Sequence, residues 1–137
     1  MTQITLTNAE DLMRLAHGMI RADQVRSCHV TALVDTGATT LMVPESVAAT
    51  LGLPVIESGL VTVANGARVE VKTCGPARLE LLGRSMSLDV MVLPGCPAVL
   101  LGQIPLEFLA LVVDPRSGEL RFDPNNPDGS QYALAVA

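Results

Sequence analysis

A chain of 137 residues that is 49% hydrophobic and only 17% charged is long enough and apolar enough to fold around one core, which excludes disorder. Aromatic residues make up 2% of the chain and the net charge is −5, which disfavours nucleic-acid binding because such surfaces need basic and stacking side chains. No apolar run approaches the roughly 18 residues of a membrane span, and the acidic N-terminus is unlike a signal peptide.

The cysteines indicate a reducing compartment. Cys28, Cys74 and Cys96 are odd in number and widely spaced, which does not fit a disulfide framework. Cys28 is followed by His29, but two adjacent ligands without a second cluster do not match the spacing of a zinc site. We therefore expect a soluble cytoplasmic protein that binds no metal and no membrane.

The N-terminal quarter predicts one helix followed by a strand. Residues 7–10, Thr-Asn-Ala-Glu, resemble a capping box, and apolar residues recur at helical spacing as far as Met19. A helix over about 8–20 is therefore expected. The pattern then changes to that of a strand over 27–34.

The rest of the chain predicts short strands and turns. Pro44 suits the first turn of a short helix that Gly52 ends. Asn65-Gly66 is a strong hairpin signal, and apolar runs at 60–64 and 67–71 flank it. Further strands are expected at 77–82, 85–93, 98–102, 110–114 and 119–123, with short helices at 45–51 and 105–109.

These elements predict a mainly β domain with two or three short helices. Its core must be aliphatic, because Tyr132, Phe108 and Phe122 are the only aromatic residues. The following methionines are expected to fill gaps in that core: Met13, Met19, Met42, Met86 and Met91.

One carboxylate ends a strand that should be buried. Asp35 follows the apolar end of the strand predicted over 27–34. It is followed at once by small and polar residues: Thr36, Gly37, Ala38 and Thr39. A turn acid that accepts hydrogen bonds from its own loop also explains this pattern. Asp-Thr-Gly alone is too short to decide between a turn and a catalytic acid.

The order of motifs along the chain resembles that of the retropepsin-like aspartic proteases. The Asp35 loop, a helix ending in Leu51-Gly52, a hairpin tip at Asn65-Gly66 and the triplet Leu100-Leu101-Gly102 before a last helix occur in the order and at about the spacing of the family. The resemblance implies an all-β, closed acid-protease barrel with one lobe per chain.

The resemblance also divides the chain. It covers about residues 27–123, the expected protease domain. It leaves residues 1–26 as an N-terminal helical extension. Residues 124–137 are then a C-terminal tail that is a candidate for a strand at a dimer interface.

The resemblance implies a role for each motif. Asp35 would be the catalytic acid, and the active-site loop around it would consist of Thr36, Gly37, Ala38 and Thr39. The flap over the substrate would consist of Ala64, Asn65, Gly66 and Ala67. The structural support of the site would consist of Leu100, Leu101 and Gly102. Two carboxylates that share one proton can activate water and protonate a carbonyl. Because no second Asp-Thr-Gly or Asp-Ser-Gly occurs, a second copy of the chain must supply the other Asp35 across a two-fold axis. No organic cofactor is implied, since the nucleophile is water.

Two functions therefore fit the sequence. The first is an aspartic endopeptidase that acts on polypeptides as a homodimer. The alternative is a non-catalytic peptide-binding or dimerisation module with the same fold, which would hold an extended peptide by strand addition.

Overall fold

The computed structural model describes residues 1–62 and 64–125. The strands are β1 (Thr2–Asn8), β2 (Ser27–Val34), β3 (Leu41–Val43), β4 (Val55–Thr62), β5 (Arg68–Leu81), β6 (Arg84–Val92), β7 (Val99–Leu101), β8 (Leu111–Val113) and β9 (Leu120–Phe122). The helices are α1 (Ala9–Ala16), α2 (Glu45–Leu51) and α3 (Gln103–Phe108), with a 3-10 turn η1 (Ala22–Gln24). This confirms the mainly β prediction with short helices.

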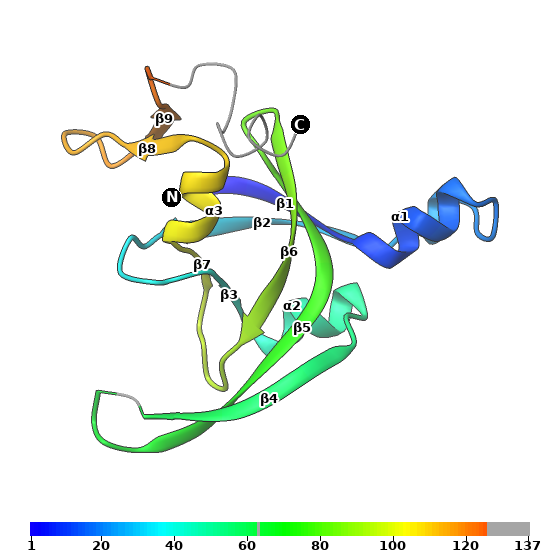
Figure 1. Ribbon diagram of the computed structural model, residues 1–137, viewed down its shortest axis with the longest axis horizontal. Coiled ribbons are helices and arrows are strands. Elements are labelled where there is room, and N and C mark those ends of the chain that lie inside the picture. The colour runs from blue at the N-terminus through cyan, green and yellow to red at the C-terminus, as the bar shows by residue number, and fades with distance from the viewer. Residues whose placement is uncertain (63, 126–137) are drawn as a thin grey trace.

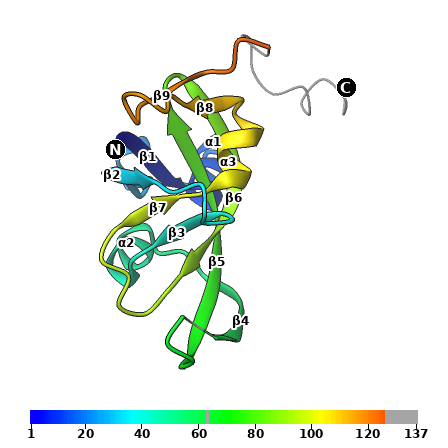
Figure 2. The ribbon, with the colours of Figure 1, turned by 90° about the vertical axis from the view of Figure 1, so that its left-hand side faces the viewer.

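The main sheet closes on itself. Its strand order is β1-β2-β7-β3-β6-β5-β4, and β1 also pairs with β5. The first six of these strands therefore form a closed barrel, and β4 continues beyond it as an edge strand beside β5 (Figure 1). The β8–β9 hairpin is a separate two-stranded sheet, which lies next to α3 (Figure 2). None of the helices in the described ranges is long and apolar enough to cross a membrane.

The first strand belongs to the barrel, contrary to the expectation of a helical extension over 1–26. β1 pairs antiparallel with β2 from Thr2 to Thr7 and with β5 from Thr5 to Asn8. Ile4 and Leu6 face the core and are 2% and 0% exposed. The alternation of polar and apolar residues before Asn8 is the period-two pattern of a half-buried strand. The capping signal holds as well, because Asn8 ends β1 and caps α1. The proposed boundary near residue 123 remains a prediction, and residues 126–137 lie outside the described residues.

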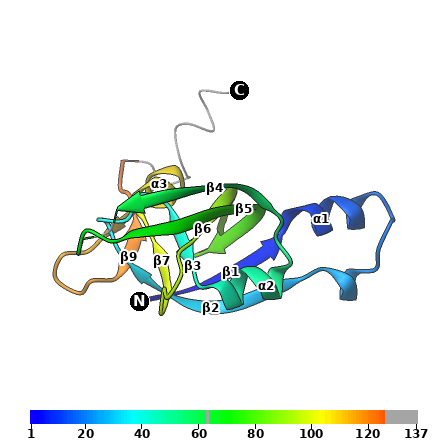
Figure 3. The same ribbon diagram turned by 90° about the horizontal axis from the view of Figure 1, so that it is seen from below.

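The helix between β1 and β2 is shorter than predicted. α1 ends at Ala16, because Gly18 adopts a left-handed backbone with φ of 70° that cannot continue the helix. Met13 and Met19 are 61% and 70% exposed, so the prediction that these two fill the core is wrong. α1 and η1 extend from the side of the barrel opposite to the tip of the β4–β5 hairpin (Figures 1 and 3).

The β4–β5 hairpin is confirmed, but β5 is one strand rather than two. It runs for 14 residues from the hairpin into the barrel. Its register against β6 shifts between Cys74 and Ala77, where Gly75-Pro76 interrupts the regular pairing. A β-bulge of this kind bends a strand. One strand can therefore belong to the barrel at one end and to the projecting hairpin at the other.

A buried carboxylate joins α1 to the barrel. Asp11, whose side chain is 4% exposed, accepts hydrogen bonds from Arg26 Nε at 2.8 Å, from Arg26 Nη2 at 3.0 Å and from the Arg26 backbone N–H at 3.0 Å. Arg14 donates a further bond of 2.9 Å. The hydrogen bonds from Arg26 hold the pKa of Asp11 well below its usual value, although burial acts in the opposite direction.

The neighbouring Asn8 extends this network to α2. Its Oδ1 accepts from the Asp11 N–H and caps α1, while its Nδ2 donates to the Leu51 carbonyl at 2.8 Å. Gly52, the αL residue that ends α2, leaves room for the Arg26 guanidinium, which a Cβ at this position would displace. The network thus fixes α1 and α2 against the ends of β1 and β2.

The charge of Asp11 should matter for stability in a pH-dependent way. Asp11→Asn is expected to lower the free energy of unfolding at pH 7 by about 1–3 kcal/mol, because charge-assisted hydrogen bonds to a buried group are lost. Since the pKa of Asp11 is lower in the folded chain than in the unfolded one, its contribution is present at neutral pH and is lost as the pH falls below about 4. The difference from wild type should therefore shrink between pH 7 and pH 3 in urea unfolding followed by circular dichroism.

Glu10→Gln is the matched control for this experiment. Glu10 lies beside Asp11 on α1 and pairs with Arg14, but its side chain is 45% exposed. Its removal should change stability by less than about 0.5 kcal/mol at either pH. Equal effects of the two substitutions, or an Asp11→Asn difference that does not depend on pH, would contradict the assigned role of the buried carboxylate.

Candidate active site

Asp35 stands at the end of β2, where that strand lies parallel to β7. The last paired residues are Val34 and Leu101, and the Asp35 N–H donates to the Leu101 carbonyl at 2.9 Å. Asp35 is exposed, and its Oδ1 accepts from the Gly37 N–H at 3.0 Å. A simple turn acid would make this bond as well, but here it also fixes the direction of a carboxylate that faces solvent.

Gly37 and the start of α3 shape the loop that carries Asp35. A Cβ on Gly37 would lie 3.2 Å from Asp35 Oδ1, tighter than ordinary van der Waals contact. The N–H groups of Gln103 and Ile104 donate to the carbonyls of Ala38 and Thr39, both at 2.9 Å. The free N–H groups at the helix N-terminus thereby hold the two sides of the loop together.

Gly102 allows this close approach. A Cβ at Gly102 would collide with the carbonyl oxygens of Ala38 and Thr40, so no other residue fits without displacing the loop. The preceding Leu101 is fully buried in the core. The structure thus brings Leu100, Leu101 and Gly102 directly against the Asp35 loop, where the sequence predicts a structural support.

The predicted flap residues lie at the tip of the β4–β5 hairpin. Thr62 pairs with Arg68 across it, and Ala64, Asn65, Gly66 and Ala67 form the turn and are exposed. Asn65 Oδ1 accepts from the Ala67 N–H at 2.9 Å, and Gly66 has φ of 83°. This tip and the Asp35 loop project from the same side of the molecule (Figures 1 and 3).

A row of side chains crosses the outer face of the sheet between the Asp35 strand and the hairpin. The pairings place these residues side by side on successive strands: Leu33 (β2), Leu100 (β7), Met42 (β3), Met91 (β6), Thr73 (β5) and Glu57 (β4). We call this set the outer row. The residues before and after its members include Ala32, Leu101, Val43, Val90 and Cys74, which are buried in the core. Because side chains alternate along a strand, the outer row faces away from the core.

The outer row reaches Asp35 at one end. Asp35 directly follows β2 and lies two residues beyond Leu33, and its N–H keeps the pairing with Leu101, so we place both side chains on the same face. At the other end lies a cavity of about 300 Å³ lined by Glu57, Ser58, Gly59, Leu60, Val61, Val71, Thr73 and Met91. The candidate acid is thus connected to the β4–β5 hairpin by an apolar track on the outer face.

This track differs from the sequence-based prediction, which places Met42 and Met91 in the core. That prediction is wrong: neither is among the residues that make up the core or pack against it, whereas Met86 does pack against it. A signal was available in β6, where Met91 shares its face with Ser85, Ser87 and Asp89. β3 carries no such signal, because Leu41, Met42 and Val43 are all apolar. A short strand that is apolar at every position buries one face and must cover something else with the other.

Cys28 and Cys74 are poor candidates for a competing nucleophile. Burial raises the pKa of the Cys28 and Cys74 thiols, which disfavours the reactive thiolate. His29, the neighbour of Cys28, is within hydrogen-bond distance of Thr5 Oγ1, at 2.8 Å from its Nδ1. Within residues 1–62 and 64–125, no group of three or more His, Cys, Asp or Glu is placed to hold a metal ion.

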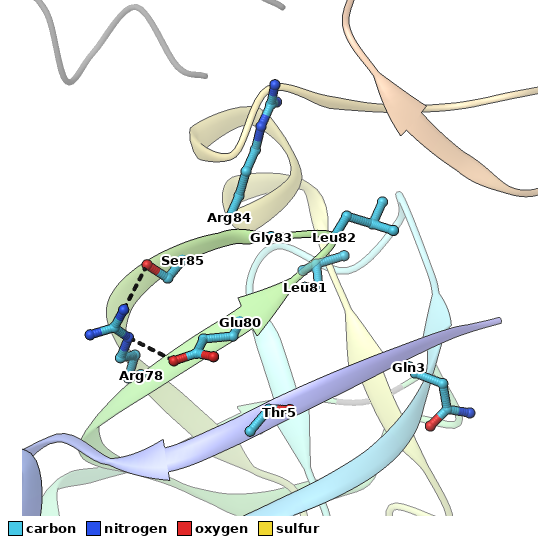
Figure 4. A pocket seen from close by; sticks show the side chains of 9 residues that line it. All are labelled: Gln3, Thr5, Arg78, Glu80, Leu81, Leu82, Gly83, Arg84 and Ser85. Carbon is cyan, nitrogen blue, oxygen red and sulfur yellow. Dashed lines mark hydrogen bonds and ion pairs between the residues drawn. The ribbon is translucent and has the colours of Figure 1, made fainter. Parts of the chain in front are cut away.

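A second cavity, of about 320 Å³, lies at the β5–β6 turn and contains neither Asp35 nor the flap (Figure 4). Its lining is polar and its charges are matched. Arg78 donates to Ser85 at 3.2 Å and its Nε lies 3.0 Å from Glu80, close enough for an ion pair although not aligned as a hydrogen bond. Arg84 points out of this cavity (Figure 4) and donates to the carbonyls of Leu109 and Ala110 at the end of α3. This cavity is therefore a less suitable candidate than the outer face beside Asp35.

The chain matches one protein family in sequence and is similar in structure to two solved proteins described below. The family described as Aspartyl protease matches residues 22–104. The retroviral protease-like domain of Ddi1 from Leishmania major is 19% identical in sequence, with a TM-score of 0.53 over 90% of this chain and 89% of that one. EIAV protease in complex with the inhibitor HBY-793 is 21% identical, with a TM-score of 0.49 over 77% of this chain and 84% of that one. A comparison with curated proteins gives no match.

The likeness to the Ddi1 domain shows the fold, which agrees with the closed barrel described above. The family match includes the Asp35 loop, the flap and Gly102, and it spans more than half of the chain. This protein therefore belongs to the aspartyl protease family and has the retropepsin-like barrel that its sequence predicts.

Proposed function

We propose that this chain is an aspartic endopeptidase that works as a homodimer, with Asp35 of each subunit forming one acid pair. The observation that carries the proposal is the position of Asp35. It is an exposed carboxylate on a loop held by β7 and α3, on the same face as an apolar track that leads to the flap hairpin. A turn acid would need none of these surroundings.

The chemistry requires a second carboxylate. One ionised carboxylate takes a proton from water, and its protonated partner donates to the carbonyl oxygen of the peptide bond. Each chain brings a single Asp-Thr-Gly, so the partner must be Asp35 of a second copy. Asp35 and Thr36 are both exposed, which leaves this loop accessible to its symmetry mate. The substrate is then an extended polypeptide that lies on the outer row beneath the flap.

The edge strand supports a second candidate function. All eight residues of β4 are exposed, and within the described ranges β4 pairs on one side only, with β5. A free edge of this kind can accept an extended peptide by strand addition without any cleavage. The alternative is therefore a peptide-binding module that keeps the protease fold.

Asp35→Asn separates the two functions. It should abolish cleavage of an unfolded polypeptide such as casein, because the amide can neither take the proton of water nor share one with its partner. Folding should be unchanged within about 0.5 kcal/mol, since the side chain is exposed. Gel analysis of the digest and urea unfolding measure the two effects.

Asp23→Asn is the control, because Asp23 is an exposed acid of η1 at the opposite side of the barrel. It should cleave casein like wild type. Undiminished cleavage by Asp35→Asn would refute the acid-pair mechanism. Peptide binding by wild type without cleavage at any pH would favour the binding module.

Mixing subunits tests the shared site. With a fixed amount of wild type and a ninefold excess of Asp35→Asn, random exchange leaves about one tenth of the wild-type subunits with a wild-type partner. Activity per wild-type subunit should therefore fall about tenfold after the subunits have exchanged. The same excess of Asp23→Asn should produce no loss. If the excess of Asp35→Asn does not change the activity per wild-type subunit, a single chain is sufficient for cleavage.

We expect both stability and activity to depend on the loop shape that Gly102 permits. Gly102→Ala is expected to lower the free energy of unfolding by about 1–3 kcal/mol and to reduce kcat/KM, because the new Cβ pushes against the backbone beside Asp35. Gly59→Ala is the stability control, since nothing lies within 4 Å of its added Cβ. A Gly102→Ala protein as stable and as active as wild type would contradict the close packing of loop and helix.

A further inference from the structure

The cavity under β4 combines apolar walls with one ionisable group. Leu60, Val61, Val71 and Met91 supply the walls, and Glu57 is the only titratable residue in the lining. Within residues 1–62 and 64–125, the side chain of Glu57 makes no hydrogen bond or ion pair. At about 300 Å³ the cavity is at the lower end of small-molecule sites, a size that suits one long side chain.

The two faces of the β4–β5 hairpin and the neighbouring β6 carry different charged residues. Glu57 pairs with Thr73 and therefore shares the face of the outer row. Asp89 precedes Met91 by two residues on β6 and lies on the same face. Arg68, Glu70 and Lys72 alternate with Val69 and Val71 on β5 and so face the other way. The face of the outer row thus carries Glu57 and Asp89, while Arg68 and Lys72 lie on the opposite face together with Glu70.

A lysine or arginine side chain matches these features. Its aliphatic stem packs on apolar walls while the cationic head reaches an acid at the end. An aliphatic side chain would cover the Glu57 carboxylate without supplying a positive charge to pair with it. An acidic side chain would be repelled by that carboxylate. We propose that Glu57 and this cavity form a subsite that selects a lysine or arginine of the peptide substrate. This inference rests on the proposed binding of polypeptides on the outer row.

The strand order limits how far the subsite can lie from the bond to be cleaved. Glu57 and Leu33 are separated by five strand spacings in the sheet order. At about 4.8 Å each, these amount to at most about 24 Å around the curved sheet, or about seven residues of extended peptide. We therefore expect Glu57 to contact a substrate residue within about seven positions of the bond to be cleaved and to affect binding rather than the chemical step.

Peptide binding to the inactive Asp35→Asn protein tests the subsite without depending on cleavage. The probes are fluorescent peptides with one apolar core, in which a single lysine, methionine or glutamate is placed at successive positions up to about seven residues from the centre. At one position or a narrow range, the lysine peptide should bind about two- to fivefold more tightly than the methionine peptide, as for a partly exposed ion pair. Added salt should reduce this preference.

Two substitutions in the same background assign the effect. Glu57→Gln should remove the lysine preference, and Glu57→Lys should transfer it to the glutamate peptide. Glu70→Gln is the matched control, because it removes the same charge from the opposite face of the hairpin. It should keep the full preference.

Equal binding of the three peptide types at every position, absent binding, or equal effects of Glu57→Gln and Glu70→Gln would each overturn the subsite. Cleavage by the protein that retains Asp35 is scored separately. A lysine preference without any cleavage would therefore uphold the subsite and refute the peptidase, whereas cleavage without preference would do the reverse.

Discussion

The contact of Gly102 with the backbone of residues 38–40 is the constraint on which the candidate site depends. It lets the first N–H groups of α3 reach the carbonyls of Ala38 and Thr39, while Leu101 accepts the N–H of Asp35. A loop with a charged tip would otherwise be free to move in solvent. Here a strand, a helix end and a glycine without a side chain hold it from three sides. The backbone that carries the carboxylate is therefore held in place although the side chain is exposed.

The barrel uses both faces of its strands, and this explains a composition that is unusually apolar for a small domain. The inner face holds the aliphatic core, and the outer face of β2, β7, β3 and β6 carries Leu33, Leu100, Met42 and Met91. Apolar side chains on an outer face are costly to leave in water. An extended peptide on that face would cover them, which agrees with the position of Asp35 at one end of the row.

Stability and function are placed at different sides of the molecule. The network of Asp11, Arg26 and Asn8 fixes α1 and α2 against the barrel on the side away from the flap (Figure 1). The flap hairpin is built in the opposite way, with all of β4 exposed and few core contacts. Regions with little burial open at low free energy, which agrees with the proposed role of this hairpin as a flap that admits a substrate.

The sequence by itself determined the local elements and the order of the motifs. Asn65-Gly66 specifies a tight turn, Gly52 ends a helix, and Asp35 after an apolar strand specifies an acid at a strand end, because each depends on neighbours in the chain. Tertiary structure alone decided that residues 2–8 close the barrel. Ile4 and Leu6 stabilise the fold only when β1 pairs with β2 and β5 and so buries these two side chains. It also decided which face of β3 is buried: a strand that is apolar at every position has no preferred side until its register with distant strands is fixed. Met42, Met91 and Glu57 therefore became neighbours only through pairings between residues far apart in the chain, which no local pattern encodes.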